Sequence, residues 1–146
     1  MNHAGTIAAG IMLAATLVGL DLAQASKRPC DVVPLTRFEI HDGDTFTHCD
    51  VSFPWGVALT DRSIRVAKVD ACEVTKTRQT VTVTDAEIIK GKECRDKLRS
   101  LANGAKAFVR PTGESVYGRL EADVYLLKSG EWINVAEWVR SNGYER

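Results

Sequence analysis

Short runs of alternating apolar and polar residues, separated by glycine, proline and aspartate, occupy much of the chain after residue 36. Successive side chains of a strand point to opposite faces of a sheet, so these runs predict half-buried strands. Residues 37–50 predict a hairpin, because Asp42-Gly43-Asp44 between two such runs is a strong turn signal. Three further strands are predicted at residues 63–69, 106–110 and 120–127.

Two other segments have the spacing of helices. Residues 84–87 (TDAE) have the capping-box arrangement that begins a helix, and Asn103-Gly104 is a typical stop signal. Gly91 leaves open whether the helix proper begins only after it. Residues 132–141 predict a second, short amphipathic helix. The threonine-rich residues 74–84 fit an extra exposed strand and a loop equally well.

The order of elements is therefore strand, strand, strand, helix, strand, strand, helix. This order predicts a mainly β fold with helices (α+β), a five-stranded OB-fold barrel. A chain of 146 residues with 45% hydrophobic content suffices for one domain with a core. We place this domain at residues 37–146, after a lead-in at residues 26–36 that contains two prolines. A fold alone does not establish a function.

Residues 1–25 differ in composition from the rest of the chain. A run of small and apolar residues at 6–20 precedes Ala23-Gln24-Ala25, which has the small-x-small pattern of a signal-peptidase site. We therefore expect a cleaved signal peptide at residues 1–25 and a periplasmic or secreted protein that no membrane holds after cleavage. An uncleaved anchor is the alternative, because no lysine or arginine precedes the apolar run.

The cysteine count bears on disulfide formation, and the net charge bears on how the protein could bind phosphate. An even number of cysteines in an exported domain suggests disulfides. Of the three possible connectivities we favour Cys30–Cys49 with Cys72–Cys94, because each closes a modest loop between neighbouring segments. The formal net charge is zero, which argues against a diffuse basic surface for nucleic acid. Any phosphate must therefore be bound by a few well-placed residues.

The candidate chemistry is concentrated around residues 64–73 (IRVAKVDACE), which predict a strand followed by two carboxylates. Arg65 lies within this strand, and Asp70 and Glu73 follow it. Carboxylates bind a hard cation and a guanidinium binds phosphate, so this pattern can hold both together. Asp44 in the hairpin turn offers a further carboxylate, and Arg119 precedes the fifth strand. A transition-metal site formed by His41 and His48 is a minor alternative.

Four motifs in this order resemble the staphylococcal nuclease-like (thermonuclease) family. They are HDGDTF at residues 41–46, IRVAKVDACE at 64–73, YGR at 117–119 and INVAEWVRSNG at 133–143. The resemblance implies an OB-fold nuclease that uses Ca²⁺ to hydrolyse phosphodiester bonds of DNA, RNA or both, and we expect it to act as a monomer.

The resemblance also implies a role for each site residue. Asp44 and Asp70 would bind the metal, together with the backbone carbonyl of Ala71. Glu73 would activate the attacking water as a general base. Arg65 and Arg119 would bind the phosphate and stabilise its charge in the transition state. Tyr117 is a weaker candidate for stacking on the substrate, and Asp42 would lie just outside the metal ligands.

Several features depart from the family pattern. Cys72 stands where the family usually has proline, so a disulfide there could hold Glu73 in place or shift it. The chain stops three residues after Gly143 and so lacks the C-terminal helix of the founding members, which leaves base preference open. The alternative is a catalytically silent OB-fold module that binds nucleic acid or a protein partner.

Overall fold

The computed structural model describes residues 27–76, 82–114 and 117–146. The expected signal peptide and the centre of the threonine-rich segment lie outside the described residues. None of the helices within the described ranges is both long and apolar enough to span a membrane.

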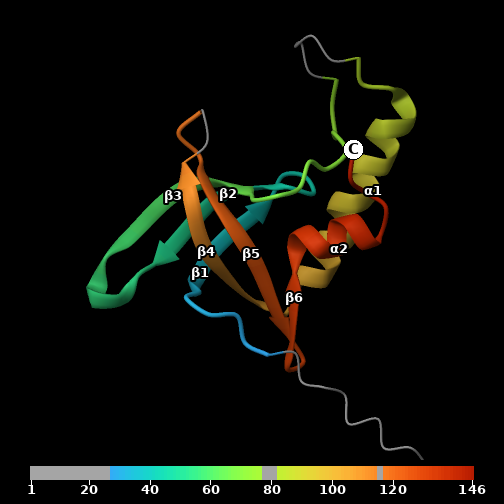
Figure 1. Cartoon of the computed structure of the whole chain (residues 1–146). Coiled ribbons are helices and arrows are strands. Elements are labelled where there is room, and N and C mark those ends of the chain that lie inside the picture. Colours follow the sequence, from blue (N-terminus) through green and yellow to red (C-terminus); the bar gives the residue numbers. More distant parts are fainter. Residues whose placement is uncertain (1–26, 77–81, 115–116) are drawn as a thin grey trace, which may run out of the picture.

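A closed five-stranded barrel forms the body of the molecule, consistent with an OB fold (Figure 1). The sheet order is β3-β2-β1-β4-β5-β6, and a parallel pairing of β3 with β5 closes the barrel, leaving β6 outside it. The elements are β1 (Val33–Ile40), β2 (Thr45–Ser52), a short 3-10 turn (Pro54–Gly56), β3 (Ala58–Val66), α1 (Asp85–Ala102), β4 (Lys106–Glu114), β5 (Leu120–Lys128), β6 (Glu131–Asn134) and α2 (Val135–Ser141). The predicted fold class and barrel are thus confirmed.

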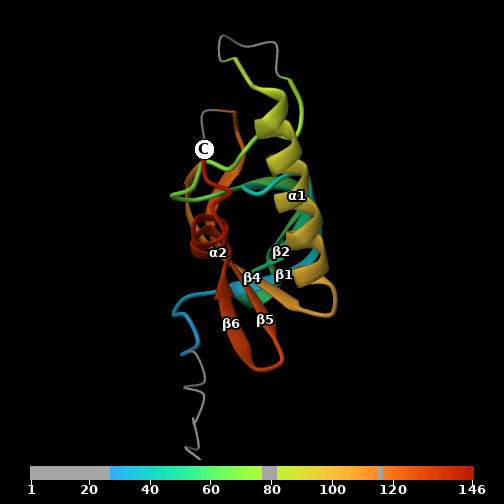
Figure 2. The same ribbon diagram turned by 90° about the vertical axis from the view of Figure 1, so that its right-hand side faces the viewer.

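Both helices lie on the same side of the barrel (Figures 1 and 2). α1 begins where the capping box predicts, since the Thr84 side chain accepts a hydrogen bond from the Glu87 backbone N–H. It continues through Gly91 without a break. Cys94 and Leu98 are buried and belong to the same hydrophobic core as Phe46 and Ile64 of the barrel.

Several predicted boundaries are wrong. β1 begins at Val33, within the predicted lead-in, and β3 begins at Ala58 rather than at residue 63. β3 ends at Val66 rather than at residue 69, because Lys68 adopts a left-handed backbone (φ 64°) in a turn. β4 continues past Pro111, where an irregularity in its register with β5 accommodates the proline. Residues 131–134, most of which were expected in the second helix, form β6, and α2 begins only at Val135, with Asn134 as its cap.

The four cysteines are all free, so neither favoured pairing forms in the structure. Cys30 is exposed near the start of the described chain, whereas Cys49 is completely buried in β2. Cys72 and Cys94 are buried as thiols. Burial raises the pKa of the Cys49 and Cys94 thiols to about 12.

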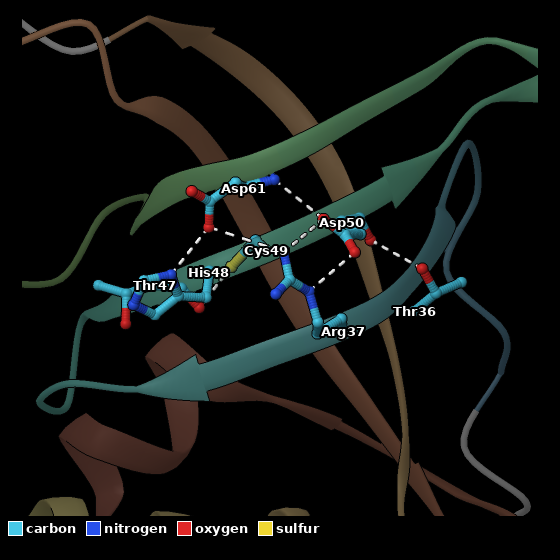
Figure 3. Close-up of polar contacts among 7 residues, drawn as sticks. All are labelled: Thr36, Arg37, Thr47, His48, Cys49, Asp50 and Asp61. Carbon is cyan, nitrogen blue, oxygen red and sulfur yellow. Dashed lines mark hydrogen bonds and ion pairs between the residues drawn. The ribbon is translucent and has the colours of Figure 1, made fainter.

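A bulge in β2 changes which residues face the core. His48 has a left-handed backbone (φ 51°) and is exposed, so Cys49 and Val51 rather than His48 continue the buried face that Phe46 begins. Figure 3 shows the polar contacts around it: the His48 ring lies 2.8 Å from an Asp61 carboxylate oxygen, and Arg37 binds Asp50 at 2.8 Å. His48 therefore belongs to a surface network that ties β1, β2 and β3 together.

Candidate active site

A pocket of about 480 Å³ opens between the β1–β2 turn, β3 and the loop that follows β3. The predicted catalytic and metal-binding residues all line it: Asp44, Arg65, Asp70, Ala71, Glu73 and Arg119. Asp42 and His41, which had weaker candidate roles, also line it, and sequence reasoning assigned no role to the two remaining lining residues, Thr45 and Thr47. The predicted Tyr117 is not among the lining residues. It is exposed, and its ring centre lies 5.7 Å from the Arg119 guanidinium carbon.

Strand pairing brings these distant parts of the sequence together. Arg65 on β3 pairs with Thr45 on β2, which places it beside Asp44 in the turn. The parallel pairing of β3 with β5 begins at Leu120, so Arg119 enters from the other side of β3. Gly43 lets the turn approach the loop closely, since a Cβ there would lie 2.7 Å from both the Ala71 Cβ and the Cys94 Sγ.

Asp44 is the most deeply buried carboxylate of the pocket, with 3% of its surface exposed. One oxygen accepts a 2.6 Å hydrogen bond from the Ala71 backbone N–H, and the other forms an ion pair with Arg65 and accepts a bond from the Thr45 hydroxyl. Burial, reinforced by the nearby Asp42, nevertheless raises the pKa of Asp44 to about 7, against the opposing effects of the Ala71 N–H and Arg65.

Arg65 bridges the two carboxylates that were predicted to bind a metal. Its guanidinium forms an ion pair with Asp44 and a 2.9 Å contact with Asp70, and it donates a 3.1 Å hydrogen bond to the Val69 carbonyl. Two carboxylates that reach one guanidinium converge on one region of space. A positive charge therefore already lies between the carboxylates, and it is supplied by the chain itself.

Glu73 lies at the edge of the pocket, where the loop passes α1. Burial, followed by the charge of Asp42, raises the pKa of Glu73, and the guanidinium of Arg146 at 3.8 Å opposes this rise. Gly91 of α1 permits the close packing, because a Cβ there would lie 2.6 Å from the Cys72 carbonyl oxygen and closer still to that of Glu73. A raised pKa brings a carboxylate nearer to the range useful for a general base.

Arg119 differs from Arg65 in its partners. Among the residues that the structure describes, its Nε is buried and has no hydrogen-bond partner. A buried donor without a partner costs free energy that an anionic ligand could recover. Arg119 is therefore suited to bind an anion in the pocket.

The donors fit a calcium ion only in part. Within the described ranges, no three histidine, cysteine, aspartate or glutamate side chains are placed to hold a metal ion by themselves. Asp44, Asp70 and the Ala71 carbonyl offer hard oxygen ligands, which Ca²⁺ prefers and which it supplements with water or substrate oxygens. His41 lines the pocket while His48 contacts Asp61, so the alternative histidine site gains no support.

Arg146 is the neighbour of this pocket that sequence reasoning missed altogether. Its proximity to Glu73 arises from a tertiary contact between residues 70–72 and 144–146, for which the sequence offers no local signal.

No protein-family model and no curated protein matches the chain.

Proposed function

We propose that this protein is an exported, Ca²⁺-dependent nuclease that hydrolyses phosphodiester bonds of DNA, RNA or both, in the manner of the staphylococcal nuclease-like family. The observation that carries the proposal is the convergence of Asp44, Arg65, Asp70, Glu73 and Arg119 in one open pocket. These residues come from three separate parts of the sequence, and a purely structural role would not require them to meet around a solvent-filled space.

In this proposal each side chain has one task. Arg119 binds a phosphate oxygen through its guanidinium, and Arg65 binds a second one after releasing part of its contact with the carboxylates. Glu73 accepts a proton from the water whose oxygen bonds to phosphorus, while the bond from phosphorus to the leaving oxygen breaks and that oxygen takes up a proton from solvent. The two guanidiniums offset the negative charge that builds on the phosphoryl oxygens.

Asp44, Asp70 and the Ala71 carbonyl would hold the calcium ion. When bound, the ion supplies a Lewis acid that polarises a phosphoryl oxygen. Asp44 must be ionised to bind it, so its raised pKa favours binding at neutral to alkaline pH. The small-x-small site at residues 23–25 supports export, and the neutral formal charge supports recognition by few residues rather than by a broad basic surface.

Digestion of supercoiled plasmid and of a labelled RNA by the purified protein tests the proposal. We expect cleavage with Ca²⁺, none with EDTA, and a loss on the order of 10²- to 10⁴-fold in Glu73→Gln. Glu131→Gln, which changes an exposed glutamate at the start of β6, is the matched control and should cleave at the wild-type rate. Binding of nucleic acid without cleavage would instead favour the silent OB-fold module.

A further inference from the structure

Residues 144–146 run alongside the loop that carries Asp70 and Glu73. Ala71 and Glu145 form an antiparallel bridge, in which the Cys72 N–H donates to the Tyr144 carbonyl (2.9 Å) and the Arg146 N–H donates to the Asp70 carbonyl (2.8 Å). The backbone of Arg146 is thus fixed directly to the loop.

Tyr144 anchors this segment to the helices. Its side chain is buried, its hydroxyl donates a 3.0 Å hydrogen bond to Glu93 of α1, and its ring packs on Trp138 of α2 with ring centres 5.9 Å apart. The segment is therefore held by both helices as well as by the loop.

The Arg146 guanidinium lies between two glutamates. Its Nε is 3.2 Å from an oxygen of Glu87 on α1, and one terminal nitrogen is 3.8 Å from an oxygen of Glu73. The three side chains are partly buried, with 26%, 17% and 31% of the Arg146, Glu87 and Glu73 side chains exposed. Low exposure weakens solvent screening, so these charge contacts restrict the side chains more than surface pairs would.

Arg146 reaches Glu73 from behind the pocket. It is not among the residues that line the active-site pocket, and it borders a separate depression with Cys72, Ala86, Glu87, Lys90 and Glu145. A substrate in the pocket would therefore meet Glu73 but not Arg146.

We infer that Arg146 is a positioning residue for Glu73: fixed by Glu87, it holds the Glu73 carboxylate at the edge of the pocket in the orientation needed to take a proton from water. The inference rests on the proposed function. Glutamate has several rotatable bonds, and a general base works only within hydrogen-bond reach of its water. A misplacement of about 1 Å commonly costs on the order of 10²-fold in rate.

Steady-state kinetics of Ca²⁺-dependent cleavage test this role. Arg146→Ala should lower kcat by about 10- to 100-fold and leave KM nearly unchanged, since Arg146 does not touch the substrate. Arg146→Lys should recover part of kcat, because an ammonium can still contact both carboxylates. The matched control is Glu145→Ala, which removes the neighbouring side chain, retains the backbone bridge and should keep the wild-type kcat.

A double-mutant cycle separates positioning from general loosening. If Arg146 acts through Glu73, adding Arg146→Ala to Glu73→Gln should lower kcat no further. An equal loss in both backgrounds, a wild-type kcat in Arg146→Ala, or a change confined to KM would each overturn the inference. Absence of cleavage by the wild-type protein would instead refute the proposed function, and the positioning role with it.

Discussion

Replacing Asp44 by asparagine should stabilise the folded protein, and the gain should grow as the pH rises. Two effects compete at this residue, because burial disfavours its negative charge while Arg65 and the Ala71 N–H favour it. Burial prevails and raises the pKa to about 7. Folded Asp44 then binds a proton more tightly than unfolded Asp44, so its contribution to stability is present at acid pH and is lost as the pH rises through 7.

The size of the effect follows from the shift. One pKa unit corresponds to about 1.4 kcal/mol, so a rise from 3.8 to about 7 corresponds to roughly 4 kcal/mol. Asparagine has no charge to bury, and its altered contacts with Arg65 shift the unfolding free energy by an amount that Asp44 titration does not affect. The free energy of unfolding of Asp44→Asn minus that of wild type should therefore increase by roughly 4 kcal/mol between about pH 4 and pH 8.

Urea unfolding at several pH values, followed by tryptophan fluorescence, measures this difference. If this difference in unfolding free energy does not change with pH, burial does not govern the titration of Asp44. If it decreases as the pH rises, the ion pair with Arg65 stabilises the ionised carboxylate by more than burial destabilises it. Asp70→Asn is the matched control, because Asp70 contacts the same guanidinium but has 63% of its side chain exposed. It should change the unfolding free energy by no more than about 1 kcal/mol, as exposed ion pairs do.

Three further outcomes are expected. Arg65→Lys and Arg119→Lys should each slow Ca²⁺-dependent cleavage of a labelled oligonucleotide by on the order of 10²-fold, because an ammonium lacks the two parallel donors of a guanidinium. Full activity in either variant would refute the proposal that this arginine binds the phosphate. Gly91→Ala should lower the urea-unfolding free energy by more than about 1 kcal/mol, because its Cβ would collide with the loop backbone, whereas Gly113→Ala, with no atom near its Cβ, should stay within about 0.5 kcal/mol. A thiol reagent should react rapidly with Cys30 alone in the native protein and with all four cysteines after unfolding without reductant, and a lower count after unfolding would show that disulfides form.

The barrel could be predicted from the sequence because its strands carry regular local signals. Alternation on either side of a tight Asp-Gly turn is a strong hairpin signal, and the Thr84 cap marks the start of α1. Wrong boundaries arose where tertiary structure overrides local preference. Pro111 suggested the end of a strand, yet the register irregularity in β4 accommodates it.

The site could be predicted only as a set of residue types in the right order. Asp44, Arg65 and Arg119 line one pocket, as the motifs suggested, because β3 pairs with both β2 and β5. The ion pairs of Arg65 with Asp44 and Asp70 could not be foreseen, since the same motif permits a guanidinium directed to solvent. The contact of Arg146 with Glu73 depends on how residues 144–146 pack between the loop and both helices, which no short motif encodes.

The energetic weaknesses of the pocket point to one kind of ligand. Asp44 is buried at a cost that Arg65 does not fully offset, and the Arg119 Nε, within the part of the chain described, is buried without a partner. A fold selected for stability alone would have replaced such groups, because buried polar groups are normally paired. A cation between the carboxylates would offset the first cost, and an anion on Arg119 the second. Arg65 links the cation and anion sites. A cation bound by Asp44 and Asp70 would replace Arg65 as their partner, and the Arg65 guanidinium could then bind the same anion as Arg119. A cation and a phosphate bound together would offset both costs, which agrees with the proposed metal-dependent nuclease.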